Sequence, residues 1–384
     1  MHPHNLSTSN SKTRQSRFKP LSRRGETVIT GIWTLIFLIL IDFSVNILFP
    51  YPTNPLAPPP GQFKTYFEYG RSLEGKLNRM IGATDEQSAS LALAGWFDAP
   101  TLQKSNLPVR HSEQQDLLIA NYGMSFSNRV TDQLEKLDSE IGVRVLGGPA
   151  APPNHTYAAY QADRKQHEAD VVSLAILASS VKAMRTMTGM TWQFESPAPY
   201  TYPRYFLNQG KLQAVTPVVH SLSGFRTALH DREQWKLFTH QLRSHDAFFS
   251  DFLMQRNLLD RSALIRLWRR AWAQRHQARS VNEVFNAEDV AVLQAIVRDF
   301  AATAKQDGKF PIVLLFNDRG YQDNLFQALK PTLEADSIPY VSSHTISPAT
   351  KLENFEGDGH FVPSVDRQIA QEVLKLINAH FHRA

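Results

Sequence analysis

LLIANYGMSFSNRV, residues 117–130, combines a buried-strand pattern, a turn and the start of a helix. The apolar run 117–120 predicts a buried strand, and Gly123-Met124-Ser125 predicts a turn after it. Apolar residues then recur at helical spacing, at Val130, Leu134, Leu137 and Ile141, with Ser127 or Asn128 as the expected helix cap. Ser125 is therefore expected at the carboxyl end of a strand and against a helix N-terminus, where reactive groups of open α/β sheets gather.

A second chemical motif lies near the other end of the chain. Gly357-Asp358-Gly359-His360-Phe361 precedes a helical pattern over residues 365–381. A serine becomes a nucleophile when a base takes its proton and an acidic group orients that base. Asp358 and His360 supply both residue types in one loop, so we expect this loop to meet Ser125.

Further apolar runs predict more buried strands at 143–146, 170–177, 310–316 and 338–341. Helical patterns lie between them, including residues 156–167 and 323–333. Strands that alternate with helices predict an α/β fold, a parallel sheet with helices on both faces. An insert at about 184–307 separates the third and fourth strands and is predicted to be mostly helical.

Two stretches of the insert have more than one interpretation. Residues 192–206 contain PAPYTYPRY, which predicts either a carbohydrate-stacking wall or packed coil. Residues 262–277 carry tryptophans beside many arginines, which predicts a helix with a solvated basic face and a buried Trp stripe. The alternative is a helix that lies on lipid headgroups or an anionic polymer. Asn286 is expected to cap the next helix.

The N-terminal part has a different composition. Residues 1–27 form a polar, basic tail that we expect to be disordered and cytoplasmic, and residues 28–49 are apolar enough to cross a bilayer. The positive residues precede this span, which predicts a single-pass protein of the inner (plasma) membrane with a periplasmic or extracellular domain. A cleaved signal peptide is the alternative that we consider weaker, because the apolar run is long.

Asp42 and Asn46 lie on one face of that span and predict either a partner membrane helix or contact with the interface. Residues 50–62 are proline-rich and predict a stiff spacer. Residues 63–116 are expected to hold an amphipathic helix, at 63–81, and a connecting segment. Residues 117–384 form the predicted α/β domain.

Composition excludes several kinds of site. The chain of 384 residues has no cysteine, so disulfides, thiolate metal sites and a cysteine nucleophile are excluded. The net charge of +5 is partly due to the tail, and no nucleic-acid motif or phosphate-binding loop is present. The histidines lack metal-ligand spacing, and we expect no metal, cofactor or nucleic-acid partner. Asn154-His155-Thr156 matches a glycosylation sequon.

The order of these motifs resembles the SGNH (GDSL-like) hydrolase superfamily. Gly123-Met124-Ser125 looks like its nucleophile block, Gly147-Gly148 like its glycine block, and Asp358-Gly359-His360 like its last block. The resemblance covers roughly residues 117–377 without the insert, and implies a flavodoxin-like three-layer fold. It implies Ser125 as nucleophile, His360 as base, Asp358 as orienter, and Gly148 as a donor to the oxyanion.

The sequence departs from that pattern at two places. The oxyanion Asn is absent, and Ser179 or Ser180 follows the third strand instead. Ser179 is then expected to donate to the oxyanion together with the backbone N–H groups of Ser125 and Gly148. The usual Asp three residues before the His is Gly357 here, with Asp358 two before and Glu356 four before; the D-G-H form resembles a variant of membrane-anchored members. The larger α/β-hydrolase fold fits less well, because Ser127 replaces the second Gly of its G-x-S-x-G turn.

These observations predict a membrane-anchored extracytoplasmic serine enzyme. Water as acyl acceptor would make it an esterase, and a sugar hydroxyl would make it an O-acyltransferase; both remain open. The expected substrate is an acylated envelope or exopolysaccharide or another ester. One alternative is a catalytically weak or inactive member that binds polysaccharide or scaffolds a membrane complex. The other is an unrelated α/β domain in which Ser125 and His360 never meet.

Overall fold

The computed structural model describes residues 23–48, 67–81, 94–98, 101–102, 106–280 and 285–383. The predicted tail up to residue 22 and the predicted proline-rich spacer lie outside the described residues, as does the start of the predicted amphipathic helix. The chain divides into two compact units, Met1–Tyr51 and Pro52–Ala384.

The first unit contains helix α1, Arg23–Leu48, of 26 residues. It is the one described helix long and apolar enough to span a membrane. Its start precedes the predicted residue 28, because Arg23 to Thr27 continue the helix. Within it the Asn46 side-chain amide donates to the Asp42 carbonyl oxygen at 2.9 Å, so part of the polar face is satisfied inside the helix.

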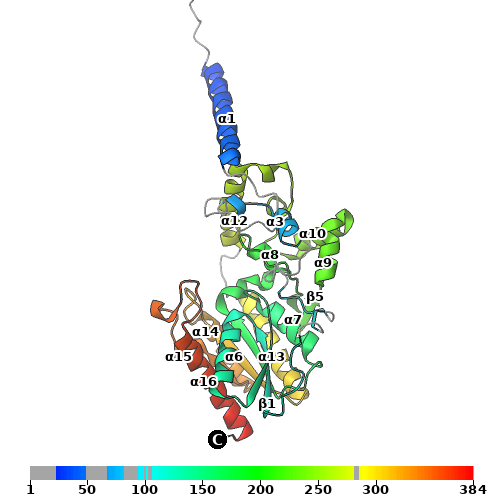
Figure 1. Ribbon diagram of the computed structural model, residues 1–384, viewed down its shortest axis with the longest axis vertical. Helices are drawn as coiled ribbons and strands as arrows, with labels where there is room; N and C mark the ends of the chain where they lie inside the picture. Colours follow the sequence, from blue (N-terminus) through cyan, green and yellow to red (C-terminus); the bar gives the residue numbers. More distant parts are fainter. Residues whose placement is uncertain are drawn as a thin grey trace, which may run out of the picture. The chain divides into compact units, whose positions relative to one another are not determined.

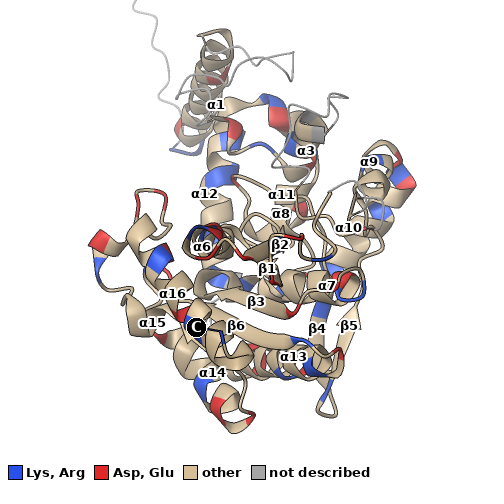
Figure 2. Cartoon of the chain, turned by 60° about the horizontal axis from the view of Figure 1, so that its bottom comes forward, with Lys and Arg blue, Asp and Glu red and all other residues tan. Residues whose placement is uncertain are grey.

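The second unit is built on a five-stranded parallel sheet in the order β2-β1-β3-β6-β7. Counted along the chain this is the flavodoxin-like order 2-1-3-4-5. Figure 1 shows this sheet among its helices, and Figure 2 labels four of its strands in the order β2, β1, β3 and β6. The strands are β1 Leu117–Gly123, β2 Ile141–Gly147, β3 Val171–Leu177, β6 Phe310–Phe316 and β7 Tyr340–Ser342. The predicted α/β class and parallel sheet are confirmed.

Alternate side chains of each central strand enter two separate apolar cores. On one face, α6 (Ser125–Leu137) and α16 (Pro363–Phe381) cover the sheet. On the other, α7 (Pro153–Asp163), α13 (Ala287–Gln306) and α14 (Asn324–Ala335) do so. The strands are buried on both faces, which explains why their sequences are apolar runs rather than alternating patterns.

Between β3 and β6 lies the insert, which is mostly helical. Its elements, listed in order, are η1 Ala178–Arg185, α8 Gly189–Trp192, β4 Arg204–Asn208, β5 Lys211–Val215, α9 Leu222–His230, α10 Arg232–His245, α11 Asp251–Met254, η2 Leu258–Arg261 and α12 Ala263–Ser280. Two short helices after β7, α15 Ser343–Ile346 and η3 Leu352–Asn354, lead to the Asp358 loop. Helix α3, Leu73–Ile81, packs Leu73 and Leu77 into the core of the insert.

Several predicted details are wrong. Ile141 begins β2 instead of extending the helical face, because α6 ends at Leu137. Helix α6 begins at Ser125, so neither Ser127 nor Asn128 is its cap; the N-cap is Met124. The insert also holds a hairpin, β4–β5, whose turn residues Gln209 and Gly210 have φ of +51° and +75°. Such paired left-handed residues suit a two-residue hairpin turn.

The tyrosine-rich loop is packed coil. Tyr200 and Tyr202 are 0% and 1% exposed, and the Tyr200 hydroxyl donates to the Pro149 carbonyl at 2.8 Å. Rings buried in this way are closed to a sugar, so the stacking-wall interpretation is wrong for these two residues. The Asn154 sequon is also buried, with the amide of Asn154 donating to the Met184 carbonyl at 2.9 Å.

The arginine-rich helix follows the favoured prediction only in part. Trp272 packs against the core of the insert and Arg275 is exposed, as predicted, but three other residues are placed the other way. Arg269 is 0% exposed and pairs with Asp260, and Arg266 is 3% exposed and pairs with Glu68 at 3.0 Å. Trp268, in contrast, is 58% exposed. The cause lies far along the chain: the carboxylate of Asp260 also accepts hydrogen bonds from the backbone and side chain of Ser72. Asn286 caps α13 as predicted, accepting from the Asp289 N–H at 2.8 Å.

Candidate active site

Ser125 occupies the first position of α6, directly after the β1 turn. The turn is tight because a Cβ on Gly123 would lie 2.1 Å from the Ser127 hydroxyl oxygen and 2.7 Å from the Ala175 Cβ. The Ser127 hydroxyl oxygen accepts from the Met124 N–H at 3.1 Å and the hydroxyl donates to the Met124 carbonyl at 2.8 Å. Gly123 and Ser127 therefore fix the backbone that presents Ser125 at the positive end of the helix.

His360 reaches this serine from a loop 235 residues further along the chain. The Ser125 Oγ and His360 Nε2 atoms are 2.6 Å apart, a hydrogen bond in which the serine hydroxyl donates when the imidazole is neutral at Nε2. Ser125 is partly exposed, so the pair can be reached from solvent. The alternative in which Ser125 and His360 never meet is wrong.

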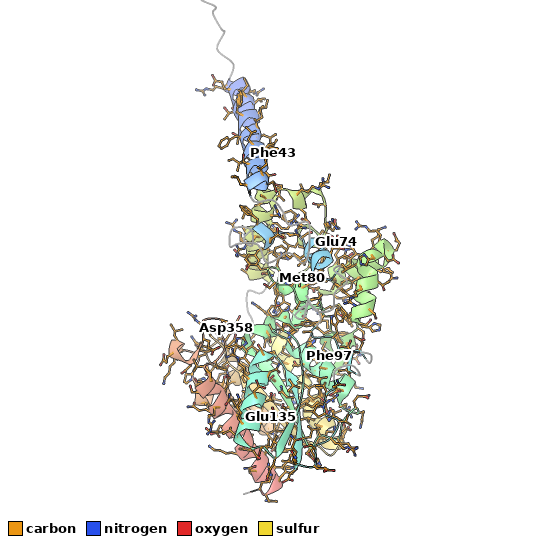
Figure 3. The ribbon with its side chains drawn as sticks, viewed as in Figure 1. Phe43, Glu74, Met80, Phe97, Glu135 and Asp358 are labelled. Carbon is orange, nitrogen blue, oxygen red and sulfur yellow. The ribbon has the colours of Figure 1, made fainter. Side chains whose placement is uncertain are left out.

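Asp358 lies on the opposite side of the imidazole. Its Oδ2 is 3.0 Å from His360 Nδ1, but the ring N–H is not aligned on the carboxylate, so the contact has the distance of a hydrogen bond without its direction. The Asp358 Oδ1 atom accepts from the His360 backbone N–H at 3.1 Å. That backbone bond first, and the imidazole second, lower the pKa of Asp358. The Asp358 side chain is 58% exposed, which makes it a solvated partner (Figure 3).

The loop that carries these residues is a closed turn. The Glu356 N–H donates to the His360 carbonyl at 2.7 Å, and Phe355 and Phe361 form an antiparallel bridge. Gly359 has φ +93°, a backbone conformation open to glycine and strained for other residues, so the D-G-H spacing depends on it. The Phe126 ring lies 4.8 Å from the imidazole and completes its packing.

Arg129 joins this loop to the serine helix. It follows Ser125 by four residues, and its Nη1 donates to Glu356 Oε2 at 2.7 Å and to the Phe361 carbonyl at 3.1 Å. Ser125 and His360 therefore share a common support. Sequence reasoning missed this contact, although a complementary charge pair four residues from Ser125 and from His360 is a usable signal.

Gly148 and Ser179 follow the two strands that flank β1. Gly147 pairs with Gly123, and a Cβ on Gly147 would lie 2.5 Å from the Gly123 carbonyl oxygen, so the Gly147-Gly148 turn lies against the Ser125 turn. A Cβ on Gly148 would lie 2.8 Å from the buried His155 ring. Burial lowers the pKa of His155 to about 3, so this ring stays neutral behind the turn.

Ser179 is engaged with a half-buried acid, Asp318. Its backbone N–H donates to Asp318 Oδ1 at 3.0 Å, from the end of β3 to the residues after β6. Burial raises the pKa of Asp318, opposed by hydrogen bonds from the side chain and backbone of Ser179. The structure thus gives Ser179 a partner that the sequence did not indicate. Among the described residues, no group of three or more His, Asp or Glu side chains is arranged to hold a metal ion.

No protein-family model matches the chain, and no curated protein matches it. Among solved structures, it is similar to one from Bacteroides fragilis described as a "putative acylhydrolase". The TM-score is 0.39 and the identity 9%, over 74% of this chain and 98% of that chain. The assignment of a function therefore depends on the geometry of the site itself.

Proposed function

We propose that the chain is a serine esterase or O-acyltransferase of the SGNH type. The observation that carries this proposal is the 2.6 Å hydrogen bond between Ser125 Oγ and His360 Nε2 at the N-terminus of α6. In the proposed reaction, His360 takes the proton of Ser125 while Oγ attacks the carbonyl carbon of an ester. The alcohol leaves with that proton, and the serine holds the acyl group.

The developing oxyanion would lie against the N-terminus of α6. The backbone N–H groups of Ser125 and Gly148 are the proposed donors, supported by the helix dipole. Ser179 is the third predicted donor to the oxyanion, and its contact with Asp318 argues against that role. Water as the second acceptor completes hydrolysis, and a sugar hydroxyl completes acyl transfer.

Helix α1 supports the proposal that the enzyme is anchored in the plasma membrane. With the basic tail inside, the site would face the periplasm or the exterior, where acylated envelope or exopolysaccharide is the proposed substrate. The buried tyrosines give no support to a polysaccharide substrate. That part of the proposal depends on α1 as a membrane anchor alone. A partner membrane protein at Asp42 and Asn46 stays part of the proposal.

The experiment uses the full chain in detergent, with p-nitrophenyl acetate as substrate. Ser125→Ala and His360→Ala are expected to lower turnover by about 10⁴-fold or more, with an unchanged thermal midpoint. Release of acetate from an acetylated polysaccharide, with and without a sugar acceptor, then separates hydrolysis from transfer.

A scaffold or polysaccharide-binding protein is the competing proposal, and the engagement of Ser179 with Asp318 favours it. It predicts that the folded wild type and both variants have equal turnover, at the level of buffer. That result would overturn the enzyme proposal.

A further inference from the structure

The insert exposes large apolar side chains on η2 and α12. Leu258 is 77% exposed, Leu259 45% and Trp268 58%. Four arginines on the same two elements and their approach are also exposed. We call these seven residues the α12 patch: Arg256, Leu258, Leu259, Arg261, Trp268, Arg275 and Arg279.

The patch is held rigid by buried polar contacts beneath it. Asp260 of η2, 6% exposed, binds Arg269 of α12, and Leu259 and Trp268 are the sequence neighbours of these two residues. Arg269 also donates to the Gly70 carbonyl at 3.2 Å. The Trp268 ring contacts Phe252, with ring centroids 5.1 Å apart. The inward positions are thus occupied by paired charges, and the apolar side chains remain outside.

The charge of the patch is positive. From residue 252 to residue 280 the one acidic residue is Asp260, and it is buried against Arg269. Figure 2 shows Lys and Arg positions of α12 in blue. Two carboxylates from other segments, Glu68 and Glu195, pair with Arg266 and Arg270 of α12. Glu74 accepts from the Arg256 backbone N–H at 2.8 Å and pairs with Arg232. No carboxylate within this segment therefore offsets the four exposed arginines.

We propose that the α12 patch docks on an anionic lipid surface. Tryptophan and leucine enter the boundary between headgroups and acyl chains, and arginines bind lipid phosphates. A hydrated anionic polymer would use the arginines and leave the three apolar side chains in water, so lipid is the better match. This proposal is independent of the activity at Ser125.

A bilayer-spanning α1 would limit how far this surface can move away from the bilayer. Helix α1 is long enough to span, and residues 49–66 follow it. A fully extended chain of that length reaches about 60 Å at most. Tethering raises the effective concentration of lipid at the patch, so a modest intrinsic affinity is sufficient for docking.

The test uses the full chain in vesicles and exploits the absence of cysteine. Ala271→Cys places a single nitroxide on the exposed face of α12, and Ala302→Cys places one on exposed α13 as the matched control. Electron paramagnetic resonance power saturation then compares collisions with lipid-soluble oxygen and with a water-soluble nickel chelate. Vesicles of phosphatidylcholine with and without phosphatidylglycerol are compared, and thermal midpoints verify that each variant is folded.

If the patch docks, the nitroxide at 271 collides more with oxygen than with the nickel chelate in vesicles that contain phosphatidylglycerol. The nitroxide at 302 collides more with the nickel chelate in both kinds of vesicle. Arg275→Glu and Arg261→Glu are each expected to lower the docked fraction about fivefold, and Trp268→Ala lowers it as well. The proposal is overturned if the label at 271 is as open to nickel as the label at 302. It is also overturned if dextran sulfate, and not phosphatidylglycerol, shields the label at 271.

Discussion

The Ser125–His360 pair and the Asp260–Arg269 pair differ in their exposure to solvent and in what they can do. The first joins segments 235 residues apart and leaves its groups accessible, with the His360 side chain 22% and Asp358 58% exposed. The second lies in the insert with Arg269 at 0% and Asp260 at 7% side-chain exposure, and it ties η2 to α12 and to Ser72. Accessible polar groups can meet a substrate, whereas closed ones can only support the structure.

The largest effect that we expect in this comparison is a loss of stability when the Asp260–Arg269 pair is broken. Arg269→Ala leaves the buried Asp260 carboxylate unpaired and is expected to cost about 3–5 kcal/mol in the free energy of unfolding. Thermal or urea unfolding measures it. The matched control is Arg243→Ala, whose partner pair with Asp251 is about half exposed, and no measurable loss is expected there. Equal losses in the two variants would show that the Asp260 pair is not structural.

The next effect concerns the acid beside the base. Asp358→Asn is expected to lower turnover by about ten- to a hundredfold, less than the loss of about 10⁴ known for a buried triad aspartate. The reason is the solvated, misaligned contact with His360. The split between kcat and KM is the second readout, because a group that supports the imidazole should change kcat and leave KM little changed. Unchanged kcat and KM would remove Asp358 from the site.

A smaller effect distinguishes the arginine contact near Ser125, at the start of α6, from the arginine contact at the other end of α6. Arg129→Ala releases the Asp358 loop from the serine helix and is expected to lower kcat about tenfold, with KM little changed. Arg383→Ala is its control, since Arg383 pairs with Asp138 at 3.0 Å and Glu140 at 2.9 Å at the far end of α6. Equal kcat values for the two variants would show that Arg129 does not position the base.

The most gradual effect is a pH dependence of stability. Burial is the main cause that raises the pKa of Asp366, in the first turn of α16, to about 7. An unfolded aspartate has a pKa near 4. Between about pH 4 and 7 the unfolded chain therefore loses a proton that the folded chain keeps, and the free energy of unfolding falls by at most about 1.4 kcal/mol per pH unit.

Asp366→Asn keeps the neutral shape and should lack this slope. Its thermal midpoint is expected to match the wild type near pH 4 and to exceed it increasingly toward pH 8. A constant difference across that range would contradict the buried-acid account of Asp366.

The sheet could be predicted from the sequence because its strands are apolar runs buried on both faces. The site could be predicted because Ser125, Gly148 and Ser179 each follow such a run. The insert could not: the exposure of Trp268 depends on Asp260, Ser72 and Glu68, and no local pattern reports a partner almost two hundred residues away. The Ser179–Asp318 contact is hidden for the same reason.

The central claim is that Ser125 is the one activated serine of the site, and covalent labelling tests it most directly. The full chain would be treated with a fluorophosphonate, digested, and mapped by tandem mass spectrometry. The account predicts one adduct on the peptide containing Ser125, lost in His360→Ala. An adduct on another serine, or no adduct on folded protein, would contradict it.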